Sequence, residues 1–150
     1  LEIQALVTNT SYNTPQRNVT GFNYKRLGML IAVLEKRIGL VMGTKDIFIN
    51  LVGGLTIDDP AADLSVISAI ASSTMDKYIE KNIILCGEVG LTGEVRSINN
   101  LDRRIAEALS LGFKKAIVPS SSLKTKKLKN VNIDLIPVGN VKEAFKILFQ

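Results

Sequence analysis

Side chains that could do chemistry are few in this chain, and their types exclude several common mechanisms. The 150 residues contain no histidine and a single cysteine, Cys86. Zinc sites of the usual kind need several cysteine or histidine ligands, and Ser-His-Asp and Cys-His catalysis both need a histidine. Cys86 ends an apolar run, where a free cysteine is typically a small core residue. We therefore predict no metal site, no internal disulfide and no histidine-dependent catalysis.

A glycine-rich segment, Gly39-Leu40-Val41-Met42-Gly43-Thr44-Lys45, is superficially similar to a phosphate-binding loop. Its spacing is one residue short, and the threonine precedes the lysine. The segment also leads from a predicted helix to a predicted strand, whereas a Walker A loop leads from a strand to a helix. We therefore predict no nucleotide site of this type in the chain.

The positive charge is unevenly distributed. The formal net charge is +5, and no acid occurs between Glu107 and Asp134. That interval holds six lysines: Lys114, Lys115, Lys124, Lys126, Lys127 and Lys129. Such a run is either a solvated rim or a surface that faces nucleic acid, and composition alone does not decide between them.

Further cations stand at predicted helix starts. Lys25 and Arg26 open the first helix, where they oppose the helix dipole, and Arg103 opens the third. The local mismatch at Lys25 and Arg26 favours a functional reason for their presence. Together with Arg17, Lys114 and Lys115, they are the candidate nucleic-acid-binding residues, with Arg26, Arg103 and Lys115 preferred.

The elements that must position these side chains follow from hydrophobic periodicity and capping residues. Asn23, Asp59 and Asn140 are predicted N-caps, as is either Asn99 or Asn100. Gly39 and Gly112 are predicted to end helices. Predicted helices follow these caps, the second running to about Lys77. Predicted strands cover residues 1–7, 16–20, 46–52 (with 55–57 as a possible extension), 83–86, 116–118 and 133–138, and a strand-turn-strand unit covers 88–96.

Length and composition are typical of one folded domain. The chain is 46% hydrophobic and has no apolar run near the about 20 residues of a membrane span. It has no basic-then-apolar leader, and its lone cysteine fits a reducing, cytoplasmic location. Because the first residue is leucine, we expect the chain to be a fragment of a longer protein.

Several motifs together point to a family. They are Gly87-Glu88-Val89-Gly90-Leu91-Thr92-Gly93-Glu94-Val95-Arg96, Val52-Gly53-Gly54 and Asp58-Asp59-Pro60-Ala61-Ala62-Asp63-Leu64, with supporting similarity over 1–7 and 21–39. The chain resembles the proteolytic domain of the Lon protease family and, more closely, the Lon-like C-terminal domain of the bacterial RadA (Sms) DNA repair family. The resemblance implies an α/β fold of the Lon proteolytic, ribosomal S5 domain 2-like type, with a mixed sheet packed with helices.

The same resemblance implies a lost active site. The Lon nucleophilic serine corresponds to Ala61, and the Lon lysine corresponds to Arg104. Alanine offers no nucleophile, and arginine stays protonated in proteins, so it cannot act as the base. Ser65 lies one helical turn after Ala61 but lacks a base. We therefore expect no peptidase activity.

A structural role for the former lysine position is a further expectation. Asp63 stands where the Lon pattern has a glycine, close to the position of Arg104. We predict that Arg104 pairs with Asp63, Asp58 or Asp59. The alternative is that Arg104 points to solvent or to DNA.

The RadA resemblance also implies partners. The longer family chain joins a zinc finger and a RecA-like ATPase to this domain, so zinc, ATP and Mg²⁺ are expected in those parts and no cofactor here. It implies hexameric rings, branch migration, binding of single-stranded or branched DNA regardless of sequence, and a recombinase partner, with no membrane contact. The alternatives are a Lon-like serine peptidase and an S5-like RNA-binding module.

Overall fold

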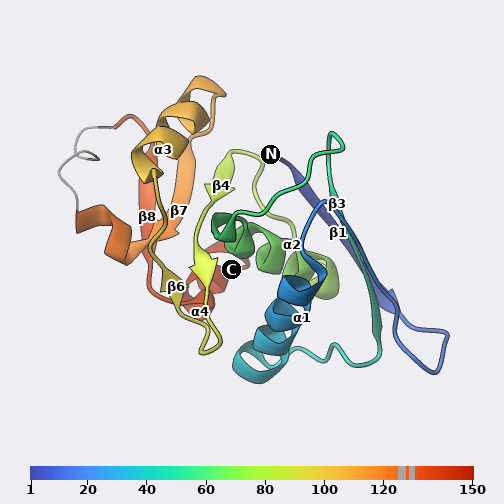
Figure 1. Cartoon of the computed structure of the whole chain (residues 1–150). Coiled ribbons are helices and arrows are strands. Elements are labelled where there is room, and N and C mark those ends of the chain that lie inside the picture. Colours follow the sequence, from blue (N-terminus) through green and yellow to red (C-terminus); the bar gives the residue numbers. More distant parts are fainter. Residues whose placement is uncertain (125–127, 129–130) are drawn as a thin grey trace.

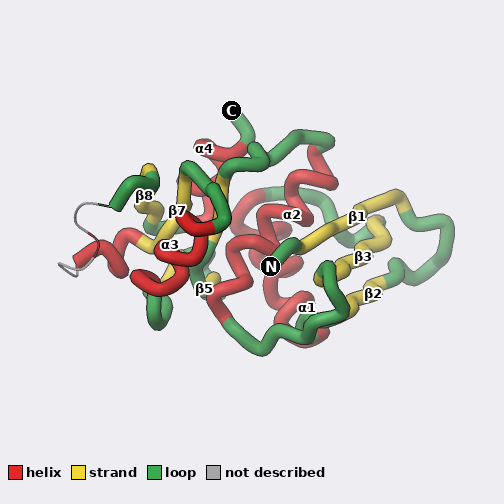
Figure 2. The backbone as a smooth tube through the Cα atoms, turned by 90° about the horizontal axis from the view of Figure 1, so that it is seen from above, coloured by secondary structure: helices red, strands yellow, loops and turns green. Residues whose placement is uncertain are grey.

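A computed structural model of the chain describes residues 1–124, 128 and 131–150 (Figure 1). The expectations for Lys126, Lys127 and Lys129, and for the side chain of Lys124, lie outside the described residues. The fold is α/β, with two small sheets and a short hairpin packed against helices. Figure 2 shows helix α2 running between the two sheets.

The first sheet is mixed and holds three strands: β1 (Ile3–Asn9), β2 (Arg17–Thr20) and β3 (Lys45–Leu51). Strand β3 is central, antiparallel to β1 and parallel to β2. Strands that are consecutive in sequence usually pair, but β1 and β2 do not pair with each other. The polar loop between them is long enough to let β3 insert, so the register of both outer strands is set by the apolar residues of β3, such as Ile49.

Two helices cover one face of this sheet. Helix α1 (Tyr24–Val33) continues as a π-helical turn, η1 (Leu34–Ile38), and ends at Gly39 with a φ of 85°. The predicted cap is present, because the Asn23 side chain accepts a 3.0 Å hydrogen bond from the Arg26 N–H. The end at Gly39 also agrees with prediction, since glycine adopts this left-handed conformation without strain.

Helix α2 (Asp63–Met75) follows a 3₁₀ turn, η2 (Pro60–Ala62). The Asp59 carboxylate accepts from the Ala61 N–H at 3.0 Å, with Pro60 next to it, as the sequence predicted. The helix ends at the left-handed residue Asp76, slightly before the predicted Lys77.

The second sheet is parallel, in the order β4 (Ile83–Leu85), β7 (Lys115–Pro119), β8 (Asp134–Val138). A short antiparallel hairpin, β5 (Glu88–Val89) and β6 (Val95–Arg96), lies between β4 and α3 (Leu101–Ser110) along the chain. After β7 comes a 3₁₀ turn, η3 (Ser120–Lys124), and after β8 the final helix α4 (Val141–Leu148).

Two local predictions are corrected. Residues 55–57 do not extend β3; the Ile57 N–H instead donates to the Gly21 carbonyl at 2.7 Å. Asn100 precedes α3 but adopts a left-handed conformation, and its side chain makes no capping bond. By contrast, Asn140 caps α4 as predicted, accepting from the Glu143 N–H at 2.9 Å.

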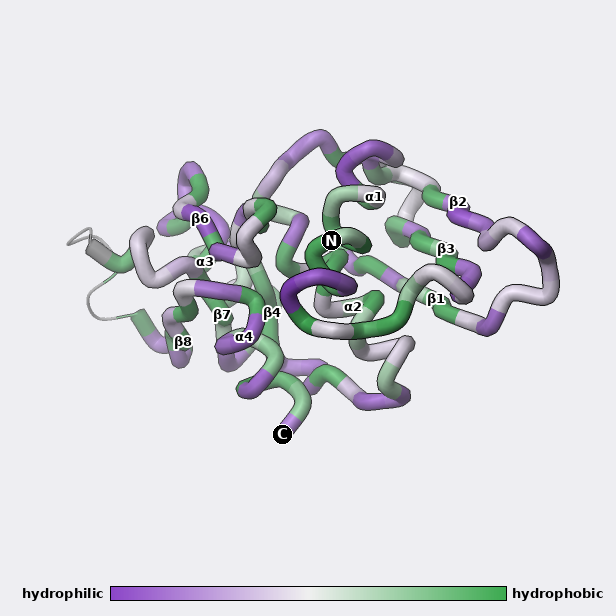
Figure 3. The backbone as a smooth tube through the Cα atoms, turned by 90° about the horizontal axis from the view of Figure 1, so that it is seen from below, coloured by the Kyte–Doolittle hydropathy of each residue, from purple (hydrophilic) through white to green (hydrophobic). Residues whose placement is uncertain are grey.

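The core consists of two clusters of buried side chains. The larger joins α1, α2, β3 and α4 and also takes in Ile117 of β7 and Val138 of β8. The smaller lies between α3 and the other face of the second sheet and contains Ile105 and Val118. In Figure 3 the strands and α2 carry green, hydrophobic stretches, whereas the loop after β1 is purple and white. Among the described residues, no helix is long and apolar enough to cross a membrane.

Candidate functional site: a pocket at the start of helix α2

A pocket of about 300 Å³ lies where η2 and the start of α2 face helix α3. Ala61 and Arg104, the two positions that the resemblance assigned to the Lon dyad, both line it. So do Asp59, Ser65 and Cys86, within a largely apolar wall. The fold therefore brings together the residues that the sequence singled out from separate segments.

Arg104 does not point freely into this pocket. Its Nη2 donates to Asp59 Oδ2 at 2.7 Å, and its Nε donates to the Asn99 carbonyl at 3.0 Å. Burial would raise the pKa of the Asp59 carboxyl, but hydrogen bonds from the Ala61 N–H and from Arg104 outweigh it, and that pKa is lowered. The carboxylate that caps the helix start thus also holds the arginine.

The remaining hydroxyl and thiol of the pocket are not activated. Ser65 Oγ donates to the Leu85 carbonyl at 2.7 Å. Burial raises the pKa of Cys86 to about 11, so the reactive thiolate is disfavoured at neutral pH. No lysine or histidine is present among the described residues that line the pocket, so neither group has an amine or imidazole base beside it.

Asp63, a second predicted partner of Arg104, pairs with a different arginine, Arg26. The Asp63 side chain is fully buried and accepts from Arg26 Nε at 2.5 Å, from Arg26 Nη2 and from the Val89 N–H at 3.0 Å. Burial raises the pKa of Asp63, and the hydrogen bonds from Arg26 and Val89 oppose that rise. Asp63 thereby ties α1 to α2 and to the hairpin.

The ion pair of Arg26 continues onto the hairpin. Glu88 Oε1 lies 3.6 Å from Arg26 and 3.8 Å from Arg96, and Arg96 pairs with Glu94 at 2.8 Å. A hydrogen bond from Thr92, helped by Arg96, lowers the pKa of Glu94 to about 2. We refer to Asp63, Arg26, Glu88, Arg96 and Glu94 as the hairpin ion network.

The candidate DNA-binding cations fall into two groups. Lys25, Arg103 and Lys114 are exposed and carry no ion pair within the described part of the chain. Lys115 pairs with Glu80 at 2.9 Å, and that hydrogen bond raises the pKa of Lys115.

Arg26 and Arg17, the other two candidates, are held within the fold. Arg26 is committed to Asp63, and Arg17 donates to the carbonyls of Met42 and Lys45. The six candidates do not form one cluster, because Lys25 lies on α1 and Arg103 on α3, which are apart in Figure 1.

Sequence reasoning missed the structural role of Arg26, although a signal was present. A cation in the first turn of a helix is unfavourable unless a partner offsets it, and here the partner is the buried Asp63. Asp58, also offered as a partner for Arg104, is exposed. Within the described ranges, no group of three or more cysteine, aspartate or glutamate residues is placed to hold a metal ion.

Comparison with known proteins agrees with the resemblance to the Lon and RadA families. The sequence model of the Lon protease (S16) C-terminal proteolytic domain matches residues 32–150. DNA repair protein RadA of Aquifex aeolicus (strain VF5) is 41% identical over 149 residues, which is 99% of this chain. The proteins of the same name from Bacillus subtilis (strain 168) and Streptococcus pneumoniae are 42% and 43% identical, over 97% and 99% of this chain. The chain spans about a third of the length of these curated relatives, 33%, 32% and 35% respectively.

Proposed function

The chain belongs to the family of Lon protease C-terminal proteolytic domains, and from that premise we propose that it is a non-proteolytic member that serves a RadA-type DNA repair protein. In this role the domain is a scaffold of a hexameric ring and offers a surface that contacts DNA. The similarity to three proteins named DNA repair protein RadA supports this assignment.

The observation that carries the proposal is the Asp59–Arg104 ion pair in the pocket that holds Ala61. Ser-Lys chemistry needs a hydroxyl and a lysine that can accept its proton. Here the hydroxyl position is an alanine, and the base position is an arginine bound to a carboxylate. Ser65 does not replace the nucleophile, because its hydroxyl donates to the Leu85 carbonyl and no lysine lines the pocket among the described residues.

The longer protein would supply the energy-dependent steps. ATP with Mg²⁺ and zinc would bind to RecA-like and zinc-finger parts outside this chain. The ring would drive branch migration during recombination in the cytoplasm, together with a recombinase. In such a ring each cation contributes a weak contact, and repetition over the subunits multiplies it.

The exposed cations are the best probes of DNA contact. Arg103 and Lys114 carry no ion pair within the described residues, so a charge change there does not orphan a carboxylate. Reversal at Arg26 would also disturb the buried Asp63, so it tests folding together with binding. Charge reversal at Arg26 should therefore lower the melting temperature, whereas charge reversal at Arg103 should leave it unchanged.

Peptidase assays test the first half of the proposal. We expect no cleavage of an unfolded protein or of a fluorogenic peptide above the buffer rate. A Ser65→Ala variant serves as the control for an unexpected nucleophile. Cleavage by the purified chain, whether or not it survives this substitution, would contradict the non-proteolytic assignment.

Salt-dependent binding tests the second half. We expect a ring-forming full-length protein to bind DNA regardless of sequence, with an affinity that falls steeply as salt rises, because counterions are released from phosphates. Arg103→Glu should weaken binding to all sequences and reduce the salt slope, with no change in melting temperature. Competition with structured RNA separates this function from an S5-like RNA-binding role. Unchanged affinity and slope after Arg103→Glu and Lys114→Glu together would place the DNA contact elsewhere.

A further inference from the structure

The first sheet has one side that the helices leave exposed. Helices α1 and α2 lie against the other side of the sheet, and this side faces solvent in the described part of the chain (Figure 2). We call it the outer face. It carries a shallow hollow of about 440 Å³. The side chains that point outwards around this hollow come from β1, β2 and β3, and they are Gln4, Leu6, Asn18, Thr20, Phe48 and Asn50.

These side chains form two rows across the sheet, and all of them are uncharged. In the first row, Phe48 lies between Leu6 and Asn18 on the neighbouring strands. Leu6 is 56% exposed there, and Phe48 is half-buried. The second row is Gln4, Asn50 and Thr20. An exposed aliphatic and aromatic pair without neighbouring charge is the composition found at the centre of contacts between proteins, where charged residues are depleted and aromatic residues are enriched.

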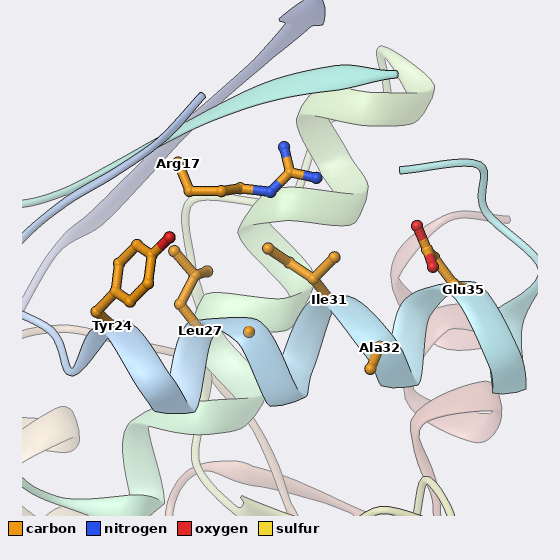
Figure 4. A pocket seen from close by; sticks show the side chains of 7 residues that line it. Arg17, Tyr24, Leu27, Ile31, Ala32 and Glu35 are labelled. Carbon is orange, nitrogen blue, oxygen red and sulfur yellow. The ribbon is translucent and has the colours of Figure 1, made fainter. Parts of the chain in front are cut away.

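The charged side chains of these strands are directed away from the outer face or are buried. Arg17 of β2 lies on the helix side of the sheet, over α1, where Figure 4 shows it above Ile31. Asp46 of β3 is 7% exposed, and its carboxylate accepts from the Gln16 N–H at 2.7 Å. Residues 3–16 contain no charged side chain, although 22% of the whole chain is charged. The uncharged surface therefore continues from the outer face into the loop after β1.

We propose that the outer face contacts a second copy of this chain. The inference rests on the proposed function, because a ring places copies side by side. DNA is a poor occupant, since its phosphates bind to cations and the side chains of this face carry none. The net charge of +5 makes two copies repel each other, and an uncharged face lets them approach without this repulsion. In a closed ring the outer face of one copy meets a different surface of the next copy.

The size of the outer face indicates a contact that is stable only within a ring. Strands β1 and β3 have 7 residues each in a sheet of 3 strands. At about 3.4 Å per residue and about 4.8 Å between strands, such a sheet offers roughly 350 Å². A stable pair of proteins buries about 800 Å² per partner. We therefore expect the isolated chain to stay monomeric, whereas a closed ring holds each copy through two contacts.

The test is sedimentation velocity of the longer protein that carries this domain, at a series of protein concentrations. Leu6→Lys places a cation in the centre of the outer face. We expect it to raise the concentration at which half of the chains are in rings by roughly tenfold or more, because like charges in a contact are costly. Leu6→Gln adds no charge and should shift this concentration less. Asn18→Lys, on β2, should act like Leu6→Lys and provides a second variant if Leu6→Lys lowers the melting temperature.

Leu91→Lys provides the matched control, since Leu91 is 66% exposed on the turn between β5 and β6, outside the outer face. We expect it to leave ring formation unchanged. Rings that are as stable in Leu6→Lys and Asn18→Lys as in the wild type would overturn the inference and leave the proposed ring intact, and so would an equal loss in Leu91→Lys. A wild-type protein that forms no ring would overturn both. Loss of binding to a different protein, with ring formation unchanged, would assign the outer face to that partner and overturn the inference.

Discussion

Two aspartates four residues apart, Asp59 and Asp63, hold arginines in different surroundings. The Asp63 side chain is fully buried beneath Arg26, whereas the Asp59 side chain is 42% exposed beside Arg104. Exposed ion pairs contribute little to stability, because both charges are well solvated when apart. A buried pair behaves differently, since removing one partner leaves a desolvated charge without compensation.

We therefore expect Asp63→Ala to lower the free energy of unfolding by about 3 kcal/mol, the lower end of the range for broken buried pairs, because Arg26 keeps some exposure. Asp59→Ala removes an exposed pair and a helix cap, and we expect it to cost about 1–2 kcal/mol. Urea unfolding of both variants measures the difference. An equal or smaller loss for Asp63→Ala would contradict a structural role for the buried pair.

At the scale of single residues, the sequence indicates the structural role of a side chain better than its ion-pair partner. Asp59 was expected both as a cap and as a possible partner of Arg104, and the structure places it in both contacts. Asp63 was one of three candidate partners of Arg104, inferred from the Lon resemblance, and it pairs with Arg26 instead. The approach of α1 to the hairpin depends on tertiary packing, which the pattern of one helix does not encode.

Among the elements, the β5–β6 hairpin is so short that its conformation depends on ion pairs as well as on backbone hydrogen bonds. Each strand has only two residues, so few ladder hydrogen bonds hold it. The hairpin ion network and the contacts of Thr92 with Glu94 supplement them. The conformation of this hairpin should therefore respond to acid.

The pH dependence follows from the lowered pKa of Glu94. Because the folded pKa is about 2, below its usual 4.5, Glu94 stabilises the fold above about pH 4.5, and this contribution is lost as the pH falls towards 2. We expect Glu94→Gln to lower the melting temperature at neutral pH and to flatten its fall between pH 5 and 2. Thermal unfolding across this range measures both effects. Parallel curves for the wild type and the variant would refute the coupling.

The elements themselves were largely predictable, and their pairing was not. Capping residues such as Asn23 and Asn140 and the glycine at position 39 mark helix ends through local hydrogen bonds and backbone angles. The insertion of β3 between β1 and β2 is a long-range event. Neighbouring strands in sequence usually pair, so the pairing of β1 with β3 in place of β2 has no local signal.

At the scale of the whole molecule, strand β7 separates the two clusters of the core. Its side chains alternate, so that Ile117 enters the larger cluster while Ala116 and Val118 enter the smaller one. The two clusters thus share a backbone segment that pairs with β4 on one side and β8 on the other. A substitution that destabilises either cluster should therefore destabilise the other as well.

We expect Ile105→Ala, in the smaller cluster, to cost about 2–5 kcal/mol, as deletion of a buried isoleucine side chain usually does. The same loss should appear in the hydrogen exchange of β3 amides, which belong to the other sheet. Ile117→Ala, in the larger cluster, is the matched variant. Unchanged protection of β3 in Ile105→Ala would mean that the two clusters unfold independently.

The resemblance to the Lon family supplied the overall architecture, which the match over residues 32–150 supports. Periodicity alone indicated helices and strands without their arrangement.

The ion pairs of Asp63 with Arg26 and of Asp59 with Arg104 also bear on whether a Lon-type protease site could be restored in this chain. A return to the Lon pattern would require serine at Ala61, lysine at Arg104 and glycine at Asp63. Asp63→Gly would leave Arg26 beside an empty space in the protein interior, and Arg104→Lys would weaken the contact with Asp59. Each of these two reversions would therefore lower stability before any activity could return. Because Asp63 and Arg26 depend on each other, the Lon pattern could be restored at Asp63 only with a loss of stability or with a second substitution at Arg26.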